Sequence, residues 1–327
     1  MKSVFLKFYK TVLVFFLLFL LPIALNKSFI YTILNISGIN AIIALGLLLL
    51  VGYAGQISFG HAGFMALGAY TSAIVITKMN MPVLVGILSG FLLTSILAGL
   101  LAIPVLKLKG YYLAMATLAF GIIFSKLVVE LKELTGGPVG IGEIPPFSIG
   151  NLVLHGEKAY FILIWSIVFI VYQFCKNIEA SHIGRILKGI HTDEDVVSCL
   201  GVEVRRIKMI LFVFSAVLAS LSGSLYAHYM KYISPEVFSV DHSVFLVMMV
   251  FLGGTKYVWG ALLGALLLNF LPEALRTYKD YSIGLYGVAL VLIVLFMPEG
   301  LSTFCVKIYE VISKSFKPSR VRDRGVF

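Results

Sequence analysis

Long apolar runs, separated by short polar turns, cover most of the chain. Most of the runs are close to the roughly 20 residues that an α-helix needs to cross the hydrocarbon core of a bilayer. The pattern predicts an all-α, polytopic integral membrane protein with ten spans, or eight if two of the runs are re-entrant. The runs lie near residues 5–25, 31–51, 57–77, 82–106, 111–130, 159–175, 207–229, 241–252, 257–275 and 282–297.

Two of the runs are irregular, and we expect broken or re-entrant helices there. Glycines interrupt the run 57–77, and the run 241–252 is too short to cross a membrane unaided. Matching irregularities in two halves of a transporter indicate pseudo-repeated halves with a solute path between them, although close helix packing is the alternative explanation for any single glycine. The glycines concerned are Gly52, Gly55, Gly60, Gly63, Gly68, Gly253, Gly254, Gly260 and Gly264.

Composition supports the membrane assignment and leaves no room for a large soluble domain. Of the 327 residues, 60% are hydrophobic and 13% are charged, whereas soluble domains carry about 25% charged residues. We therefore treat residues 1–327 as a single transmembrane domain. The three cysteines, Cys175, Cys199 and Cys305, have the spacing of neither a metal site nor a disulfide framework.

The net charge of +10 is explained by membrane topology. With the N-terminus in the cytoplasm, 18 Lys and Arg residues fall on the inner side and seven on the outer side, as the positive-inside rule requires. This split predicts that both termini are cytoplasmic. The lipid bilayer, and no nucleic acid, is then the partner that the basic surplus indicates.

Three segments outside the spans differ in character. The outward segment 131–158 contains turn residues and is predicted to be a small extracytoplasmic segment. The segment 302–327 is predicted to be a basic cytoplasmic tail. The inward segment 176–206 is polar, has few turn residues and is predicted to be helical.

The inward segment contains an amphipathic pattern that calls for a partner. Ile183, Ile186, Leu187 and Ile190 recur at the spacing of one helix face. A helix lying on lipid is one interpretation, but the acidic triplet 193–195 disfavours anionic headgroups. A protein that accepts the helix in a groove fits better.

These residues lead to a family. The segment from Glu179 to Lys208 resembles the cytoplasmic coupling loop of ABC importer permeases, which is of the EAA type. The form is that of LivM-type permeases of branched-chain amino-acid importers, which belong to the hydrophobic amino-acid uptake family. The resemblance runs in order from about residue 31 to residue 301. Further matching stretches are Gly52–Ala62, Gly68–Tyr70, Lys109–Tyr112, Thr117–Leu118, Leu134–Pro138, Tyr232–Glu236, Gly253–Gly254, Trp259–Gly260 and Met297–Leu301.

The resemblance implies a coupling loop that docks on an ATPase. Arg185, Lys188 and the acidic triplet would contact the ATPase, while Ile183, Ile186 and Ile190 would fill its groove. The residues assigned to this loop are Glu179, Ile183, Gly184, Arg185, Ile186, Lys188, Gly189, Ile190, Asp193, Glu194, Asp195 and Gly201.

The resemblance also implies the rest of an importer. The expected partners are a second homologous permease subunit, two cytoplasmic ATPase subunits and an extracytoplasmic solute-binding protein. Leucine, isoleucine or valine would cross by ATP-driven alternating access. Urea or a short amide is the alternative cargo. An ion-coupled secondary transporter is the alternative mechanism, which the lack of carboxylates deep within spans disfavours, because Asp241, Glu273 and Glu299 lie at span ends.

Polar residues and glycines within the apolar runs are the candidates for the solute path. His61 could pair internally or help to close the path. Asn269 and Glu273 mark the ninth run. The candidates are Gly55, Gln56, Ser58, Gly60, His61, Thr117, Gly253 and Gly254.

The sequence does not predict an enzyme. It has no GxxxxGK[ST] phosphate-binding loop, so ATP and Mg²⁺ would be used by the partner ATPases. No metal-ligand set or catalytic grouping is recognisable, and no cofactor is expected on this chain.

Overall fold

The computed structural model describes residues 28–149, 152–275, 284, 287, 288, 290, 291, 295, 297 and 299–315. The first predicted span, 5–25, and most of the tenth, 282–297, lie outside the described residues, as does the tail beyond residue 315. Eight of the ten predicted runs can therefore be compared with the structure.

Seven helices of the described part are long and apolar enough to cross a membrane. An eighth, α11, spans Val240–Gly253 and is shorter, as its sequence predicted. The prediction of an all-α, multi-pass membrane protein is confirmed. The seven helices are α2 with its π-helical continuation η1 (Ser28–Leu47 and Leu48–Tyr53), α3 (His61–Met79), α4 (Val83–Val105), α5 (Tyr111–Glu130), α7 (Glu157–Ala180), α10 (Val204–Met230) and α12 (Val258–Leu275).

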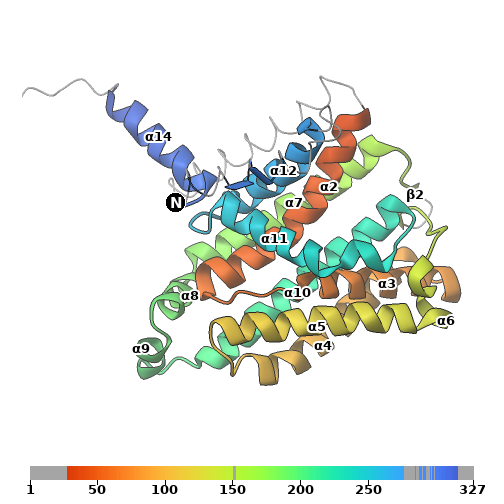
Figure 1. The fold of residues 1–327 in the computed structure, drawn as a ribbon, viewed down its shortest axis with the longest axis horizontal. Coiled ribbons are helices and arrows are strands. Elements are labelled where there is room, and N and C mark those ends of the chain that lie inside the picture. The colour runs from red at the N-terminus through yellow and green to blue at the C-terminus, as the bar shows by residue number, and fades with distance from the viewer. Residues whose placement is uncertain are drawn as a thin grey trace, which may run out of the picture.

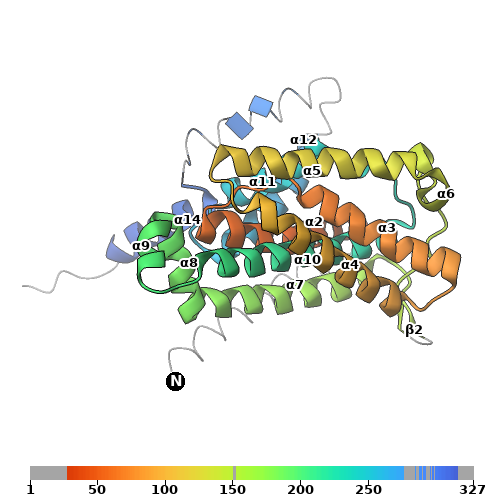
Figure 2. The same ribbon diagram turned by 90° about the horizontal axis from the view of Figure 1, so that it is seen from below.

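Short elements gather at the two ends of the helix bundle (Figures 1 and 2). One end carries α8 (His182–Thr192) and α9 (Glu194–Cys199), and we call it the α8–α9 end. The opposite end carries α6 (Lys132–Thr135) and an antiparallel hairpin of two-residue strands, β1 (Ser148–Ile149) and β2 (Leu152–Val153), and we call it the hairpin end. The remaining elements are η2 (Gly137–Val139), η3 (Pro235–Phe238) and α14 (Leu301–Ser315).

The connecting segments that the charge pattern assigned to opposite sides lie at opposite ends. At the α8–α9 end, Arg205 donates a hydrogen bond to the carbonyl oxygen of Ile103 (2.9 Å), and the Tyr53 hydroxyl donates to that of Lys256 (3.3 Å). At the hairpin end, Lys78 donates to the carbonyl oxygen of Glu133. The spatial grouping agrees with the predicted alternation of spans.

The described helices form two halves of opposite direction. Residues of α3 pair with residues of α10 in increasing order, so the two helices are parallel: His61 meets Ser215 and Ser72 meets His228. α2 runs antiparallel to α10, because Ser222 donates to the carbonyl oxygen of Ile39 (2.8 Å) while Gly46, later in α2, lies against Ser215, earlier in α10. α2, α3 and α4 thus correspond to α10, α11 and α12 with inverted topology, an arrangement found in many transporters.

A short motif recurs at the corresponding point of each half. Residues 53–58 and 229–234 share Tyr at the first position and Ile-Ser at the last two. In both copies the third residue is left-handed, with φ of 65° at Gly55 and 58° at Lys231. Each motif leads out of a long helix into a non-helical stretch before α3 or α11 begins, which supports the prediction of pseudo-repeated halves.

The break in the first half lies at the start of the predicted run, between Gly55 and Gly60, two of the glycines named for it. α3 is continuous from His61 to Met79, and the non-helical stretch covers residues 55–60. Gly68 serves close packing instead, because a Cβ there would lie 2.2 Å from the carbonyl oxygen of Ser220 in α10. His61 lies beside Ser215, eleven residues or roughly 16 Å into α10. α3 therefore begins inside the bundle.

Candidate functional site

Two caps divide the inward segment into two short helices. Ser181 precedes α8, and its hydroxyl accepts a hydrogen bond from the backbone N–H of Gly184 (3.4 Å). Asp193 precedes α9 and accepts from the N–H groups of Asp195 (2.9 Å) and Val196 (3.2 Å). Both are favoured N-cap residues. The two caps thus produce a pair of short helices joined by a turn, where we expected a helical coupling loop.

The apolar face of α8 is divided between the protein core and the surface. Leu187 and Ile190 are buried in the chain's own core, Ile186 is half-buried, and Ile183 is 53% exposed. The expected groove-filling role is therefore corrected for Ile190, whose side chain packs inside this chain. The glycines of α8 serve local packing: a Cβ at Gly184 would lie 2.4 Å from two carbonyl oxygens, and one at Gly189 would lie 3.0 Å from Val197.

Each residue of the acidic triplet makes a contact within its own chain. Asp193 caps α9, Glu194 pairs with Lys208 of α10, and Asp195 lies 3.6 Å from Lys109 between α4 and α5. Lys188 is likewise engaged, because its ammonium lies 3.6 Å from Glu179. The pair with Lys208 is largely buried and joins α9 to α10, whereas the pairs of Lys109 and Lys188 are more exposed and contribute little to stability.

The side chains of four exposed residues of these helices make no contact described above. Arg185 is exposed and has no ion-pair partner within the described part of the chain. Val196 and Leu200 of the α9 segment are 58% and 78% exposed, and Gly201 (φ 80°) ends that segment. We call Ile183, Arg185, Val196 and Leu200 the α8–α9 surface.

The α8–α9 unit also touches the helix break of the first half. The Lys188 ammonium lies 5.0 Å from the centre of the Tyr53 ring. A Cβ at Gly55 would lie 3.1 Å from the His191 ring. Gly55, predicted as a path residue, is thus placed at the α8–α9 end. Its neighbour Tyr53 is a contact that the sequence reasoning missed.

Three of the predicted path residues come together at the start of α3. His61 bridges two hydroxyls, with Nδ1 3.1 Å from Ser58 Oγ and Nε2 2.8 Å from Ser215 Oγ. Thr117 Oγ1 of α5 accepts from the N–H of Phe59 (3.0 Å). The side chains of Ser58, His61, Thr117 and Ser215 are buried, whereas that of Phe59 is half-buried. The network satisfies both ring nitrogens of His61, which confirms that it pairs internally.

Serines of the second half complete this network, and the sequence analysis did not single them out. Ser243 near the start of α11 accepts from the N–H of Ala62 (3.2 Å), so the first turns of α3 and α11 meet. Nearby, Gln56 is 4% exposed and its Oε1 has no hydrogen-bond partner among the described residues. A single serine in an apolar run gives no signal of such a role, because its partner is distant in sequence.

The remaining path candidates are required by packing. A Cβ at Gly60 would lie 2.8 Å from the carbonyl oxygen of Thr117. One at Gly253 would lie 2.0 Å from that of Gly260, where α11 crosses α12, and one at Gly254 would lie 2.4 Å from Ser302 Oγ. These glycines permit close contacts between backbones.

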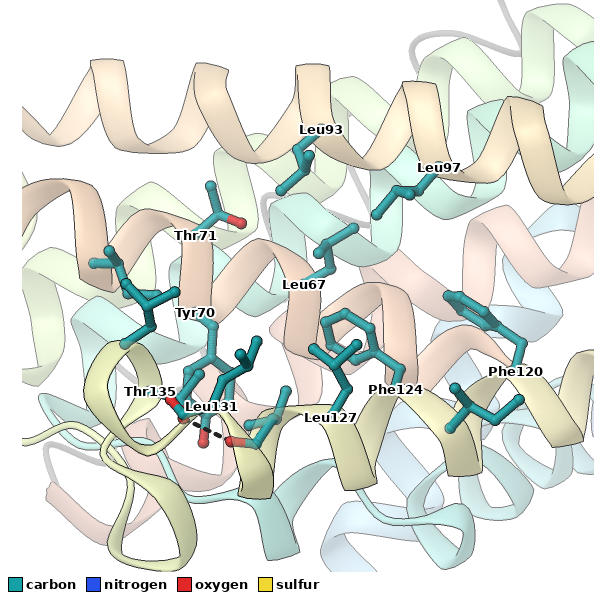
Figure 3. Close-up of a pocket in the computed structure, with 14 residues that line it drawn as sticks. Leu67, Tyr70, Thr71, Leu93, Leu97, Phe120, Phe124, Leu127, Leu131 and Thr135 are labelled. Atoms are coloured by element: carbon teal, nitrogen blue, oxygen red, sulfur yellow. Dashed lines mark hydrogen bonds between the residues drawn. The ribbon is translucent and has the colours of Figure 1, made fainter.

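An apolar groove of about 390 Å³ lies between α3, α4 and α5 (Figure 3). Leu67, Leu97, Phe124 and Leu127 are among its lining residues, none of which is charged. Its few polar groups are partly engaged: the Thr135 hydroxyl lies 2.6 Å from the carbonyl oxygen of Val128. Such a lining suits hydrocarbon chains and offers nothing that recognises a charged solute.

Comparison with known proteins identifies relatives over most of the chain. The family model described as branched-chain amino acid transport system / permease component matches residues 29–297. The high-affinity branched-chain amino acid transport system permease protein LivM of Escherichia coli K12 is 30% identical over 88% of this chain and 74% of its own length. The corresponding LivH protein of that strain is 25% identical over 80% and 90%. No solved structure gives a significant match.

Proposed function

The chain belongs to the family of permease components of branched-chain amino acid transport systems, and from this premise we propose that it is the translocating subunit of an ATP-driven ABC importer. Its cargo is leucine, isoleucine or valine. It lies in the bacterial inner membrane with both termini in the cytoplasm. The α8–α9 end then faces the cytoplasm.

One observation carries the mechanism: the α8–α9 unit contacts three membrane elements at once. Glu194 pairs with Lys208 of α10, and Lys188 lies near Glu179 of α7 and near the Tyr53 ring at the break before α3. A push on the α8–α9 surface is therefore transmitted to the helices on either side of that break. Reorientation of these helices alternates access to the solute path.

The partners follow from the same proposal. Relatives named LivM and LivH both match this chain, which supports pairing with a second, similar permease subunit. Two ATPase subunits, which bind ATP and Mg²⁺ themselves, dock on the cytoplasmic side, where this chain presents the α8–α9 surface. A solute-binding protein delivers cargo at the hairpin end, near residues 131–158. This chain itself is no enzyme and binds no cofactor.

Uptake by a deletion strain expressing the complete importer tests the proposal against its alternatives. Labelled leucine accumulates and labelled urea does not. ATP depletion abolishes leucine uptake, whereas a protonophore applied while ATP is maintained leaves it intact. Uptake of urea would replace the proposed cargo. Loss of leucine uptake with the protonophore alone would indicate ion coupling instead.

A further inference from the structure

An open cavity of about 500 Å³, lined by both polar and apolar residues, lies where α2, α3, α10, α11, α12 and η3 meet. Its volume is within the roughly 300–1,000 Å³ that small-molecule sites occupy. One wall is polar, formed by Asn40, Glu236, Ser239, Asp241, His242 and Asn269. The other wall is apolar and includes Ile36, Met65, Met230 and Phe245.

The cavity extends from the middle of the spans, at Asn40, to the end of α10 at Met230 and to Glu236 of η3. Asn40 is twelve residues, or about 18 Å, from the start of the 26-residue span of α2 and η1. It is 3% exposed and donates to Asn269 Oδ1 of α12 (3.1 Å). Polar side chains held at mid-span are costly in a membrane and commonly mark a solute site. This cavity also lies between the two inverted halves, where transporters place their substrates.

The first turn of α11 offers a site for a carboxylate. Ser239 precedes this helix, and its side chain makes no capping hydrogen bond. The backbone N–H groups of Val240, Asp241 and His242 form no backbone hydrogen bond within the described residues. The positive end of the helix dipole and free N–H groups favour a bound anion. Independently, Nε2 of His242 is buried at the cavity and has no hydrogen-bond partner among the described residues.

The cavity also has carboxylates and an apolar wall, which suit the other two groups of an amino acid. Glu236 and Asp241 are exposed at the cavity and have no ion-pair partner in the described part of the chain. They favour an ammonium group, whereas Met65 and Phe245 favour an aliphatic side chain. A zwitterionic amino acid presents these three groups together. The apolar groove of Figure 3 has only the last of these features.

We propose that this cavity binds an α-amino acid with an aliphatic side chain inside the permease itself. The ligand carboxylate faces the first turn of α11 and His242, its ammonium faces Asp241 and Glu236, and its side chain contacts Ile36, Met65 and Phe245. The site is a station on the import route, and in this respect it rests on the proposed function.

Binding of labelled leucine to the purified transmembrane–ATPase complex in nanodiscs, without the solute-binding protein, tests the site. Two competitors each lack one of the two charges of leucine: 4-methylpentanoate has no ammonium and 3-methylbutylamine has no carboxylate. Both bind the unmodified complex at least roughly tenfold more weakly than leucine, because each lacks a charge-assisted contact.

The variants then assign each charge to its residues. The double variant Glu236→Gln/Asp241→Asn weakens leucine roughly tenfold and leaves 4-methylpentanoate unchanged. His242→Phe weakens leucine and 4-methylpentanoate but not 3-methylbutylamine, and His242→Gln, which keeps a donor, restores part of the affinity. Glu143→Gln, which changes an exposed carboxylate at the hairpin end, leaves binding unchanged.

Two results overturn the site: leucine affinity unchanged in both cavity variants, or no leucine binding to the unmodified complex. Size-exclusion elution and thermal unfolding of each variant show that a loss of binding is not a loss of fold. Uptake by the complete importer is measured on the same preparation. Intact leucine uptake without cavity binding overturns the site alone, whereas absence of leucine uptake overturns the proposed function.

Discussion

The ion pair between Glu194 of α9 and Lys208 of α10 yields an asymmetric prediction. The Lys208 side chain is 10% exposed and that of Glu194 is 30% exposed. Glu194→Gln leaves a buried ammonium without its counter-charge, whereas Lys208→Met leaves a carboxylate that water can reach. Breaking a fully buried pair costs about 3–5 kcal/mol. Partial exposure of Glu194 lowers this, so we expect about 2 kcal/mol for Glu194→Gln and less than about 1 kcal/mol for Lys208→Met.

Unfolding in mixed micelles, followed by circular dichroism, measures these free energies. The control is Arg206→Met, which breaks the exposed pair with Glu203 (3.7 Å) and should cost at most about 1 kcal/mol. The exchange Glu194→Lys/Lys208→Glu should recover part of the loss. Equal costs for Glu194→Gln and Arg206→Met, or a larger cost for Lys208→Met, would refute the assignment of a buried pair at this position.

Three further predictions concern the membrane helices. Gly68→Ala should destabilise the protein by more than about 2 kcal/mol in the same assay, because its Cβ would meet the backbone of Ser220. The control Gly99→Ala in α4, where a Cβ meets nothing within 4 Å, should stabilise the protein by up to about 1 kcal/mol. Equal effects of the two substitutions would contradict the packing account. His61→Phe should cost about 2–3 kcal/mol, because it leaves the Ser58 and Ser215 hydroxyls without a partner; Ser215→Ala should cost less, and a neutral His61→Phe would exclude the network as a structural link. Lys231→Gly should be neutral or stabilising by up to about 1 kcal/mol, because it relieves a left-handed residue (φ 58°); a clear loss of stability would argue against that conformation.

The sequence predicted the spans well because each one depends on local hydrophobicity. Eight runs correspond to described helices, and even the shortness of α11 was visible. The exact extent of the break before α3 could not be read from the glycines, because a glycine can serve either a helix break or close packing. Gly68 serves packing, while the break follows the motif 53–58. Comparison with its copy at 229–234 would have located the break from the sequence alone.

The candidate site was harder to predict because its contacts are distant in sequence. The acidic triplet has the same charges whether it contacts a partner or its own chain, and only the positions of Lys109 and Lys208 distinguish the two cases. Likewise, Ser215 and Ser243 acquire their roles from His61 and Ala62. Patterns along one helix cannot reveal such partners.

The central claim is that force enters this chain at the α8–α9 surface, and Arg185→Glu tests it most directly. Arg185 is exposed and has no ion-pair partner within the described residues, so the reversal should leave the fold intact. Leucine uptake and ATP hydrolysis are measured together in vesicles that contain the complete importer. The account predicts that uptake per ATP hydrolysed falls at least roughly tenfold, as expected when a charge at an interface meets its like. An unchanged ratio, with normal uptake, would contradict it.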